Sequence, residues 1–272
     1  ALVEAWQDHG EVVAVTGDGV NDGPALRTAA IGVAMGAGGT EVARQAADLV
    51  LTDDRLETVV HAVEEGRRIQ DNLKRFLRYA LSGGVAEVLY MLFAPLLGFR
   101  VPLLPGQILW VNMLTHGLPG VAMGAEPVAP DAMRRPPIAP DARVIDRVLA
   151  ARIAATGLLI AVVTAGGALL SREIDADART SAFLVLGLAQ LWVALAIRDR
   201  GAMRANRFLN IAVAGAVLLQ VAAVTLPPLQ RLLNTEALPA QAWVHCLLLS
   251  TIPALVLRLV AWVRRHARHR TV

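Results

Sequence analysis

The sequence is poor in the residues that disulfide-bonded and nucleic-acid-binding proteins use. Its only cysteine, Cys246, excludes an internal disulfide, and the apolar neighbours of Cys246 indicate a packed thiol rather than a reactive one. Lysine also occurs once, at Lys74, and the formal net charge of +3 is too small to indicate a nucleic-acid partner. No basic segment followed by an apolar core opens the chain, so no signal peptide is predicted. The first residue is Ala rather than Met, from which we expect a fragment.

Apolar residues, by contrast, make up 55% of the 272 residues, more than a soluble domain of this size needs. Six apolar stretches are each close to the roughly 20 residues that a bilayer core requires. These stretches are 79–99, 103–124, 148–170, 181–197, 208–226 and 242–263. We therefore expect an integral, multi-pass membrane protein with an all-α bundle of six transmembrane helices over residues 79–263.

The arginines between these stretches predict the orientation of the chain. If the first part of the chain is cytoplasmic, twelve arginines lie on the inner side of the membrane and four on the outer side. The inner ones are Arg134, Arg135, Arg143, Arg147, Arg198, Arg200, Arg204, Arg207, Arg264, Arg265, Arg268 and Arg270, and the outer ones Arg100, Arg172, Arg179 and Arg231. Because basic residues accumulate on the cytoplasmic side, the amino-terminal part and the basic tail, residues 264–272, should both face the cytoplasm.

The first 78 residues are compatible with water and divide into two parts. Residues 1–54 alternate short apolar runs with helical segments, which is typical of a parallel α/β layer. Residues 55–78 begin a long helical pattern without proline that should continue directly into the first membrane span.

The string TGDGVNDGPAL, residues 16–26, follows the strand-like run VVAV in the α/β part. Asp18 and Asp22 together could hold Mg²⁺, and Asn21 could donate a hydrogen bond to a phosphoryl oxygen. A loop of this kind at the end of a parallel strand is where α/β folds bind ligands. The alternative is a turn rich in Asp, Asn and Gly that carries no chemistry.

Polar residues also interrupt the apolar stretch WVNMLTHGLPG, residues 110–120. Asn112, Thr115 and His116 stand at i, i+3 and i+4, so they share one face of a helix. At about 1.5 Å per residue, Glu87 and Gln190 on two other spans fall at the same depth, roughly 14–20 Å below the outer boundary. Ionisable groups near the midplane are costly, so this convergence predicts an ion path.

Two alternatives remain open for this set. Asn112, Thr115 and Gln190 could simply form hydrogen bonds between helices, and His116 could be only the partner that the Glu87 carboxylate needs. Just past His116, Gly117 and Pro119 should interrupt the helical hydrogen bonds and free carbonyl oxygens, as in the broken helices of transporters.

Several motifs together resemble one family. The string TGDGVNDGPAL followed by IGVAMG and DLVLTDD is similar to the end of the phosphorylation domain of P-type cation-transporting ATPases, which belong to the haloacid dehalogenase superfamily. The resemblance continues through EEGRRIQDNLKRFLRY, LLPGQILWVNMLTHGLPG and MRRPP. It covers essentially the entire chain, most strongly residues 11–137, and is closest to the calcium-pump-like branch.

The resemblance implies ATP-driven cation transport across the cell membrane through an aspartyl-phosphate intermediate, with ATP and Mg²⁺ as cofactors. It implies a Rossmann-type phosphorylation domain in which Asp18 binds Mg²⁺, Asn21 contacts nucleotide or phosphoryl group beside Thr16 and Gly17, and Asp22 supports the loop. The catalytic residues that it implies for this chain are Asp18, Asn21 and Asp22.

The resemblance also implies partners and absences. The phosphorylated aspartate of the DKTG motif, the nucleotide-binding and actuator domains and the first four membrane helices would lie in a missing amino-terminal part of the pump. The family's phosphate-contacting lysine is missing too, since Lys74 lies in the helix entering the membrane. This chain alone should therefore be inactive in phosphoryl transfer.

The membrane residues depart from the calcium-pump pattern. Calcium pumps have Asn, Asp and Glu at the positions of Gly84, His116 and Gln190, whereas Glu87, Asn112 and Thr115 match. Loss of two carboxylates and an amide counts against a high-affinity Ca²⁺ site, and imidazole suits protons or borderline transition metals. We therefore expect Glu87 and His116 to form a pH-sensitive pair that takes part in transport of another cation or in proton counter-flow.

Two other classes of protein compete with the pump. One is a non-catalytic membrane remnant or an accessory subunit that binds an ion without ATP turnover. The other is a membrane-tethered phosphatase, for which Asp8 is the only upstream nucleophile and lacks the DxD context.

Overall fold

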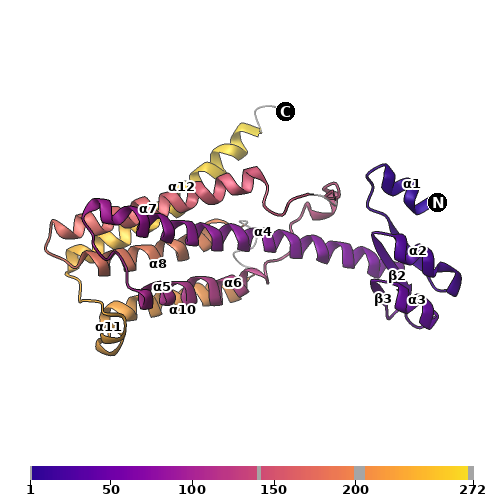
Figure 1. The fold of residues 1–272 in the computed structure, drawn as a ribbon, viewed down its shortest axis with the longest axis horizontal. Coiled ribbons are helices and arrows are strands. Elements are labelled where there is room, and N and C mark those ends of the chain that lie inside the picture. Colours follow the sequence, from indigo (N-terminus) through magenta and orange to yellow (C-terminus); the bar gives the residue numbers. More distant parts are fainter. Residues whose placement is uncertain (1, 140–141, 199–205, 269–272) are drawn as a thin grey trace. The chain divides into compact units, whose positions relative to one another are not determined.

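The computed structural model describes residues 2–139, 142–198 and 206–268, which divide into two compact units (Figure 1). Unit 1 comprises Ala1–Gln70 and Val128–Val144, and unit 2 comprises Asp71–Pro127 and Ile145–Val272. Arg200, Arg204 and Arg270, three of the arginines expected on the inner side, lie outside the described residues.

Unit 1 contains a three-stranded parallel sheet in the order β1-β2-β3. The strands are β1 (Ala14–Gly17), β2 (Ile31–Met35) and β3 (Leu49–Leu51), with Thr16 opposite Val33 and Ala34 opposite Val50. The helical elements are α1 (Leu2–Asp8), the 3₁₀ turn η1 (Val20–Asp22), α2 (Gly23–Thr28) and α3 (Glu41–Ala46). Parallel strands need a crossover connection, and α2 and α3 supply it in the α/β alternation predicted for residues 1–54.

The sheet is held by a small core and by carboxylates that bind backbone amides. Leu26, Ala34 and Ala43 are fully buried where α2 and α3 pack on β2. Asp54 accepts hydrogen bonds from the amides of Gly36 (2.6 Å), Ala37 (3.1 Å) and Gly38 (2.6 Å). These bonds, that from Gly38 foremost, hold the pKa of Asp54 below its ordinary value. The carboxylate thus ties the turn after β2 to the end of β3.

Helix α4 (Leu56–Phe93) begins in unit 1 and ends in unit 2 as one unbroken helix. Within unit 1, Nη1 of Arg67 on α4 donates to the carbonyls of Ala132 (2.5 Å) and Arg135 (2.6 Å), on either side of the 3₁₀ turn η4 (Ala132–Arg134). The arginine therefore holds the returning segment against α4.

Unit 2 is a helical bundle that contains the rest of α4 (Figure 1). Its other elements are the 3₁₀ turn η2 (Ala94–Leu97), α5 (Pro105–Asn112), the π-turn η3 (Met113–Gly117), α6 (Leu118–Met123), α7 (Arg147–Arg172), α8 (Ala178–Ala196), α10 (Arg207–Thr225), α11 (Pro227–Leu233) and α12 (Ala240–Arg268). Side chains of Asp146, Asp177 and Asn206 cap the first turns of α7, α8 and α10. Helix α8 is buried on nearly all sides, as expected for a helix that is apolar all round.

Five helices of the described chain are long and apolar enough to cross a membrane: Leu56–Leu97, Arg147–Arg172, Ala178–Ala196, Arg207–Thr225 and Ala240–Arg264. They match five of the six predicted stretches. The ends of the last four differ from the prediction by one to three residues, whereas the first helix already begins at Leu56, within the part predicted as a stalk helix. The predicted span 79–99 stops being α-helical at Phe93, because Pro95 lacks an N–H and disfavours helical geometry in the residue before it. Helix α12 extends into the basic tail, residues 264–272, as far as Arg268.

The predicted span 103–124 differs most from expectation. It begins at Pro105 and is divided into α5, the π-turn and α6, none of which alone is long enough to span. The interruption was expected after His116, but the π-turn already begins at Met113 and includes Thr115 and His116. The sequence therefore predicted a broken helix correctly, but the irregular turn begins four residues before the expected position at Gly117.

Candidate functional site

The loop after β1 in unit 1 is folded around the Asp22 carboxylate. Oδ2 of Asp22 accepts hydrogen bonds from the amides of Asp18 (3.1 Å) and Gly19 (2.9 Å), and the amide of Thr40 donates to the carbonyl of Asp18 (2.7 Å). Asp22 thus fixes the loop that connects β1 to α2. Asp18 and Asn21 are exposed on this loop, Thr16 is exposed on β1, and Gly17 is buried at the end of β1.

The loop offers one free carboxylate for a metal ion. Asp18 lies just past the carboxyl end of a parallel strand, and no contact within the described chain occupies its carboxylate. The described residues contain no group of three or more His, Cys, Asp or Glu side chains arranged to hold a metal. Mg²⁺ fits such a site, since it keeps several waters and takes one or two carboxylates together with substrate phosphates.

Glu87 is the centre of the polar set in unit 2. Its side chain is buried within the bundle, in α4, with 7% of its surface exposed. Oε2 accepts a hydrogen bond from Nδ2 of Asn112 on α5 (3.1 Å), and Oε1 accepts one from Nε2 of Gln190 on α8 (3.1 Å). Three helices therefore converge on one carboxylate, as the depths of these residues predicted.

The backbone of the π-turn is stabilised by a side chain from α4. In a regular α-helix the carbonyl of Thr115 would accept a hydrogen bond from residue 119, but Pro119 has no N–H. The buried hydroxyl of Tyr79 donates to that carbonyl instead (2.9 Å), while Oγ1 of Thr115 donates to the carbonyl of Val111 (2.8 Å). The Thr115 hydroxyl hydrogen is thus engaged within its own helix.

His116 lies beside Gln190 rather than in contact with the Glu87 carboxylate. Its ring meets that of Tyr79 edge to face, with centroids 6.0 Å apart, and its Nε2 is buried without a hydrogen-bond partner. A Cβ atom on Gly83 would lie 2.5 Å from Oε1 of Gln190 and 3.1 Å from Nε2 of His116, so only glycine allows both side chains to approach α4 here. Both atoms are buried without partners, which leaves two free polar groups beside the Glu87 cluster.

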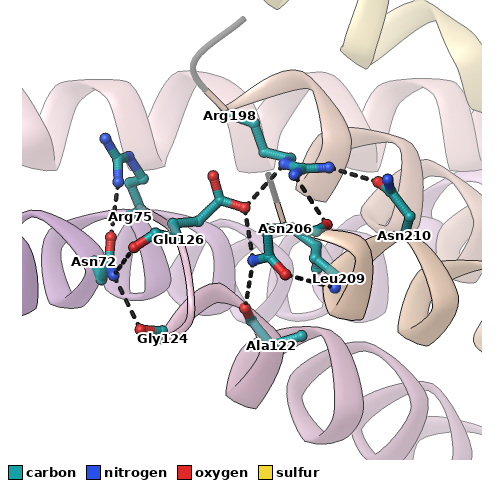
Figure 2. Close-up of polar contacts among 9 residues, drawn as sticks. All are labelled: Asn72, Arg75, Ala122, Gly124, Glu126, Arg198, Asn206, Leu209 and Asn210. Carbon is teal, nitrogen blue, oxygen red and sulfur yellow. Dashed lines mark hydrogen bonds and ion pairs between the residues drawn. The ribbon is translucent and has the colours of Figure 1, made fainter. Parts of the chain in front are cut away.

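A second polar cluster, which the sequence did not reveal, lies at the carboxyl end of α6 (Figure 2). Glu126 and Arg198 form an ion pair with 3.0 Å between Oε1 and Nε, and their side chains are only 1% and 2% exposed. Nδ2 of Asn206 donates to Oε1 of Glu126 (2.9 Å) and to the carbonyl of Ala122 (2.8 Å). Nη1 of Arg198 donates to Oδ1 of Asn210 (2.6 Å).

Helix α4 takes part in the same cluster. Nδ2 of Asn72 donates to the carbonyls of Gly124 and Glu126, both at 3.0 Å, which satisfies groups that the end of α6 leaves without helical partners (Figure 2). The cluster, defined as Asn72, Glu126, Arg198, Asn206 and Asn210, thus ties α6 to α4, α8 and α10. From the sequence, Arg198 indicated only the orientation of the chain in the membrane, because no sequence pattern pairs this arginine with a glutamate 72 positions earlier.

Comparison with known proteins identifies the family. Residues 100–263 match the family described as cation transporting ATPase, C-terminus. The chain belongs to the cation-transporting ATPases. Similar proteins include a calcium-transporting ATPase of Bacillus subtilis (strain 168), 42% identical over 265 residues that make up 94% of this chain and 30% of that protein.

Two further relatives support the same assignment. The probable cation-transporting ATPase F of Mycobacterium tuberculosis (strain H37Rv) is 39% identical over 94% of this chain and 29% of its own length. The mouse calcium-transporting ATPase type 2C member 2 is 38% identical over 88% of this chain and 26% of its own length. The ATPase chain thus spans about 30% of these relatives, in the carboxyl-terminal portion, and is an integral membrane protein.

Proposed function

We propose that this chain supplies the end of the phosphorylation domain and the cation-binding helices of an ATP-driven pump that works through an aspartyl-phosphate intermediate. In this proposal unit 1 is part of a dehalogenase-type domain, and it faces the cytoplasm together with the carboxyl terminus. The α5–η3–α6 segment counts as a sixth membrane span in the plasma membrane. The remainder of the pump provides most of the ATP site and the phosphorylated aspartate.

The observation that carries the proposal is the buried Glu87 carboxylate with amides from α5 and α8 directed at it. Burying a carboxylate in an apolar bundle is costly, and such residues mark ion pathways in membrane proteins. Rotation of the Asn112 and Gln190 amides would replace their N–H groups with oxygens around a cation. Glu87 and the two amides then supply hard oxygen ligands from three helices, with Thr115 and His116 at the neighbouring π-turn.

The transported cation in this proposal is not Ca²⁺. The site has one carboxylate, whereas Ca²⁺ takes 6–8 oxygen ligands and binds more tightly as their negative charge increases. His116 brings an imidazole nitrogen, which suits protons or borderline transition metals. Its effect on Glu87 would pass through Gln190, which hydrogen-bonds Glu87 and lies beside Nε2 of His116.

In unit 1, Asp18 is the proposed Mg²⁺ ligand and Asn21 the proposed contact to nucleotide or phosphoryl group, beside Thr16 and Gly17. Bound Mg²⁺ would neutralise charge on the phosphoryl group. Asp22 positions both residues, since its carboxylate accepts two amides of the same loop.

ATP-driven uptake into inside-out vesicles that contain the full-length pump tests this function. We expect uptake of a cation other than Ca²⁺, or ATP-driven proton exchange. In His116→Asp the added carboxylate should shift preference toward Ca²⁺ by roughly tenfold or more. The matched control is His61→Asp, on the exposed part of α4 in unit 1, which should leave ion preference unchanged.

Two outcomes would contradict the proposal. Absence of ATP-driven uptake for every cation tested would exclude the pump. Unchanged ion preference and pH dependence in His116→Asp would exclude the role of His116.

A further inference from the structure

Three arginines from different helices form a cationic cluster in unit 2 that has no carboxylate partner among the described residues. Arg78 lies on α4, Arg152 on α7 and Arg264 on α12, and the latter two are close enough to repel the Arg78 guanidinium. Nε of Arg78 is buried without a hydrogen-bond partner, and the structure gives none of the three an ion pair. A half-buried guanidinium beside two like charges is unfavourable unless an anion compensates them.

The helices that carry these arginines pack closely. A Cβ atom on Gly157 of α7 would lie 2.6 Å from Cγ1 of Val85 and 2.9 Å from the carbonyl of Ser82, both on α4. Arg152 and Arg78 each lie one to two turns before this contact on their own helices. Helix α12 packs on α7, and its carboxyl-terminal turns, which include position 264, lie at the end of the bundle where α7 begins (Figure 1).

Apolar surface adjoins the arginines. Val148 lies one turn before Arg152 on α7 and is 58% exposed, and Val260 lies one turn before Arg264 on α12 and is 41% exposed. The ring of Trp262 on α12 lies against that of His266, with centroids 4.2 Å apart and the ring planes tilted by 37°. Tryptophan near the end of an apolar helix is typical of the membrane–water interface, where lipid headgroups lie.

We propose that Arg78, Arg152 and Arg264 bind the phosphate of an anionic phospholipid whose acyl chains lie along the apolar faces of α7 and α12. The charges match, because the cluster is cationic and the headgroup phosphate is anionic. Guanidinium groups bind phosphate with paired hydrogen bonds, for which Arg is better suited than Lys. The proposal concerns lipid binding and does not depend on pump activity.

Native mass spectrometry of the chain, purified with phosphatidylcholine alone or with one fifth phosphatidylglycerol, tests this site. Wild-type protein should retain phosphatidylglycerol in preference to phosphatidylcholine. Each Arg→Gln substitution should weaken retention about fivefold, and Arg78→Gln, Arg152→Gln and Arg264→Gln together about a hundredfold, as expected for basic groups near a membrane surface. The matched control, Arg231→Gln on α11 at the other end of the bundle, should behave as wild type.

Three results would overturn the site. The first is equal retention of phosphatidylglycerol by the wild type and the triple Gln variant, when circular dichroism and thermal unfolding show that both proteins are folded. If the triple Gln variant does not fold, the triple Arg→Lys variant and the single Gln variants test the site. The triple Arg→Lys variant should retain phosphatidylglycerol. The second contradicting result is single Gln variants that retain as much phosphatidylglycerol as the wild type. The third is displacement of the lipid by millimolar inorganic phosphate, which would indicate a free-phosphate site.

Discussion

At the scale of single residues, the bundle satisfies its most costly polar groups with partners from other helices. The Glu87 carboxylate on α4 accepts hydrogen bonds from the side-chain amides of Asn112 and Gln190, and the Tyr79 hydroxyl on the same helix donates one to the carbonyl of Thr115. Each bond crosses a helix boundary, so each polar group helps to specify which helices are neighbours. The groups without partners, Nε2 of His116 and Oε1 of Gln190, lie next to Glu87, where we propose that a cation binds.

The Tyr79 hydroxyl should stabilise the broken helix. In Tyr79→Phe the Thr115 carbonyl loses its side-chain donor while Pro119 still offers no N–H, which should lower the free energy of unfolding by about 1–3 kcal/mol. Thermal unfolding in detergent micelles measures the change.

Tyr90→Phe is the matched control for this prediction. Tyr90 is equally buried on α4, with 2% exposure, but its hydroxyl has no partner, so removing that hydroxyl should not destabilise the protein. Equal losses in the two variants would show that the Tyr79 hydrogen bond contributes nothing specific.

Part of the site could be predicted from single residues, and part could not. Counting residues from the ends of the spans correctly predicted that Glu87, Asn112 and Gln190 lie together, because regular helices convert sequence position into depth. The expected pair of Glu87 and His116 is not present in the structure, since no hydrogen bond or ion pair joins these two side chains. His116 lies within the π-turn, whose extra residue rotates side chains away from the positions of an α-helix.

At the scale of elements, the Glu126–Arg198 pair fixes where α6 ends. The pair and its amides join the residues after α6 to the end of α8 and the first turn of α10 (Figure 2). This end of α6 is about two turns from Thr115 and His116.

Breaking this ion pair should be strongly destabilising. Glu126→Gln or Arg198→Met alone leaves an uncompensated charge in a site that is 1–2% exposed, and should cost about 3–5 kcal/mol of unfolding free energy. The double variant should lose less than the sum of the two, because no charge remains unpaired. Thermal unfolding of the four proteins in a double-mutant cycle checks this, and strictly additive losses would argue against a coupled pair.

The elements themselves were largely predictable. Four of the six apolar stretches are continuous helices with nearly the expected bounds, and a fifth is the end of the long helix α4, because length and apolar composition determine which segments can span a bilayer. The interior of the sixth was not predictable, since Pro119 indicates a break but not whether the chain responds with a kink, a 3₁₀ turn or a π-turn. The Glu126–Arg198 contact depends on tertiary packing, for which the sequence has no periodic signal.

At the scale of the whole molecule, the two units carry two kinds of chemistry. Unit 1 is a parallel sheet with a carboxylate-rich loop at its strand ends, and unit 2 is a helical bundle whose outer surface is apolar. Leu109, Val121, Leu158 and Leu218 of unit 2 are each more than half exposed, as expected for side chains that face lipid. In the function that we propose, the two units are parts of one pump.

The central claim is that the transported cation binds at Glu87. Cation-dependent ATP hydrolysis by the full-length pump tests it most directly, in Glu87→Gln and in the control Glu173→Gln, which makes the same change at an exposed position after α7. Glu87→Gln should abolish cation-dependent hydrolysis or raise the half-saturating cation concentration by roughly tenfold or more, while Glu173→Gln retains the wild-type value. A wild-type cation dependence in a folded Glu87→Gln pump would contradict the account.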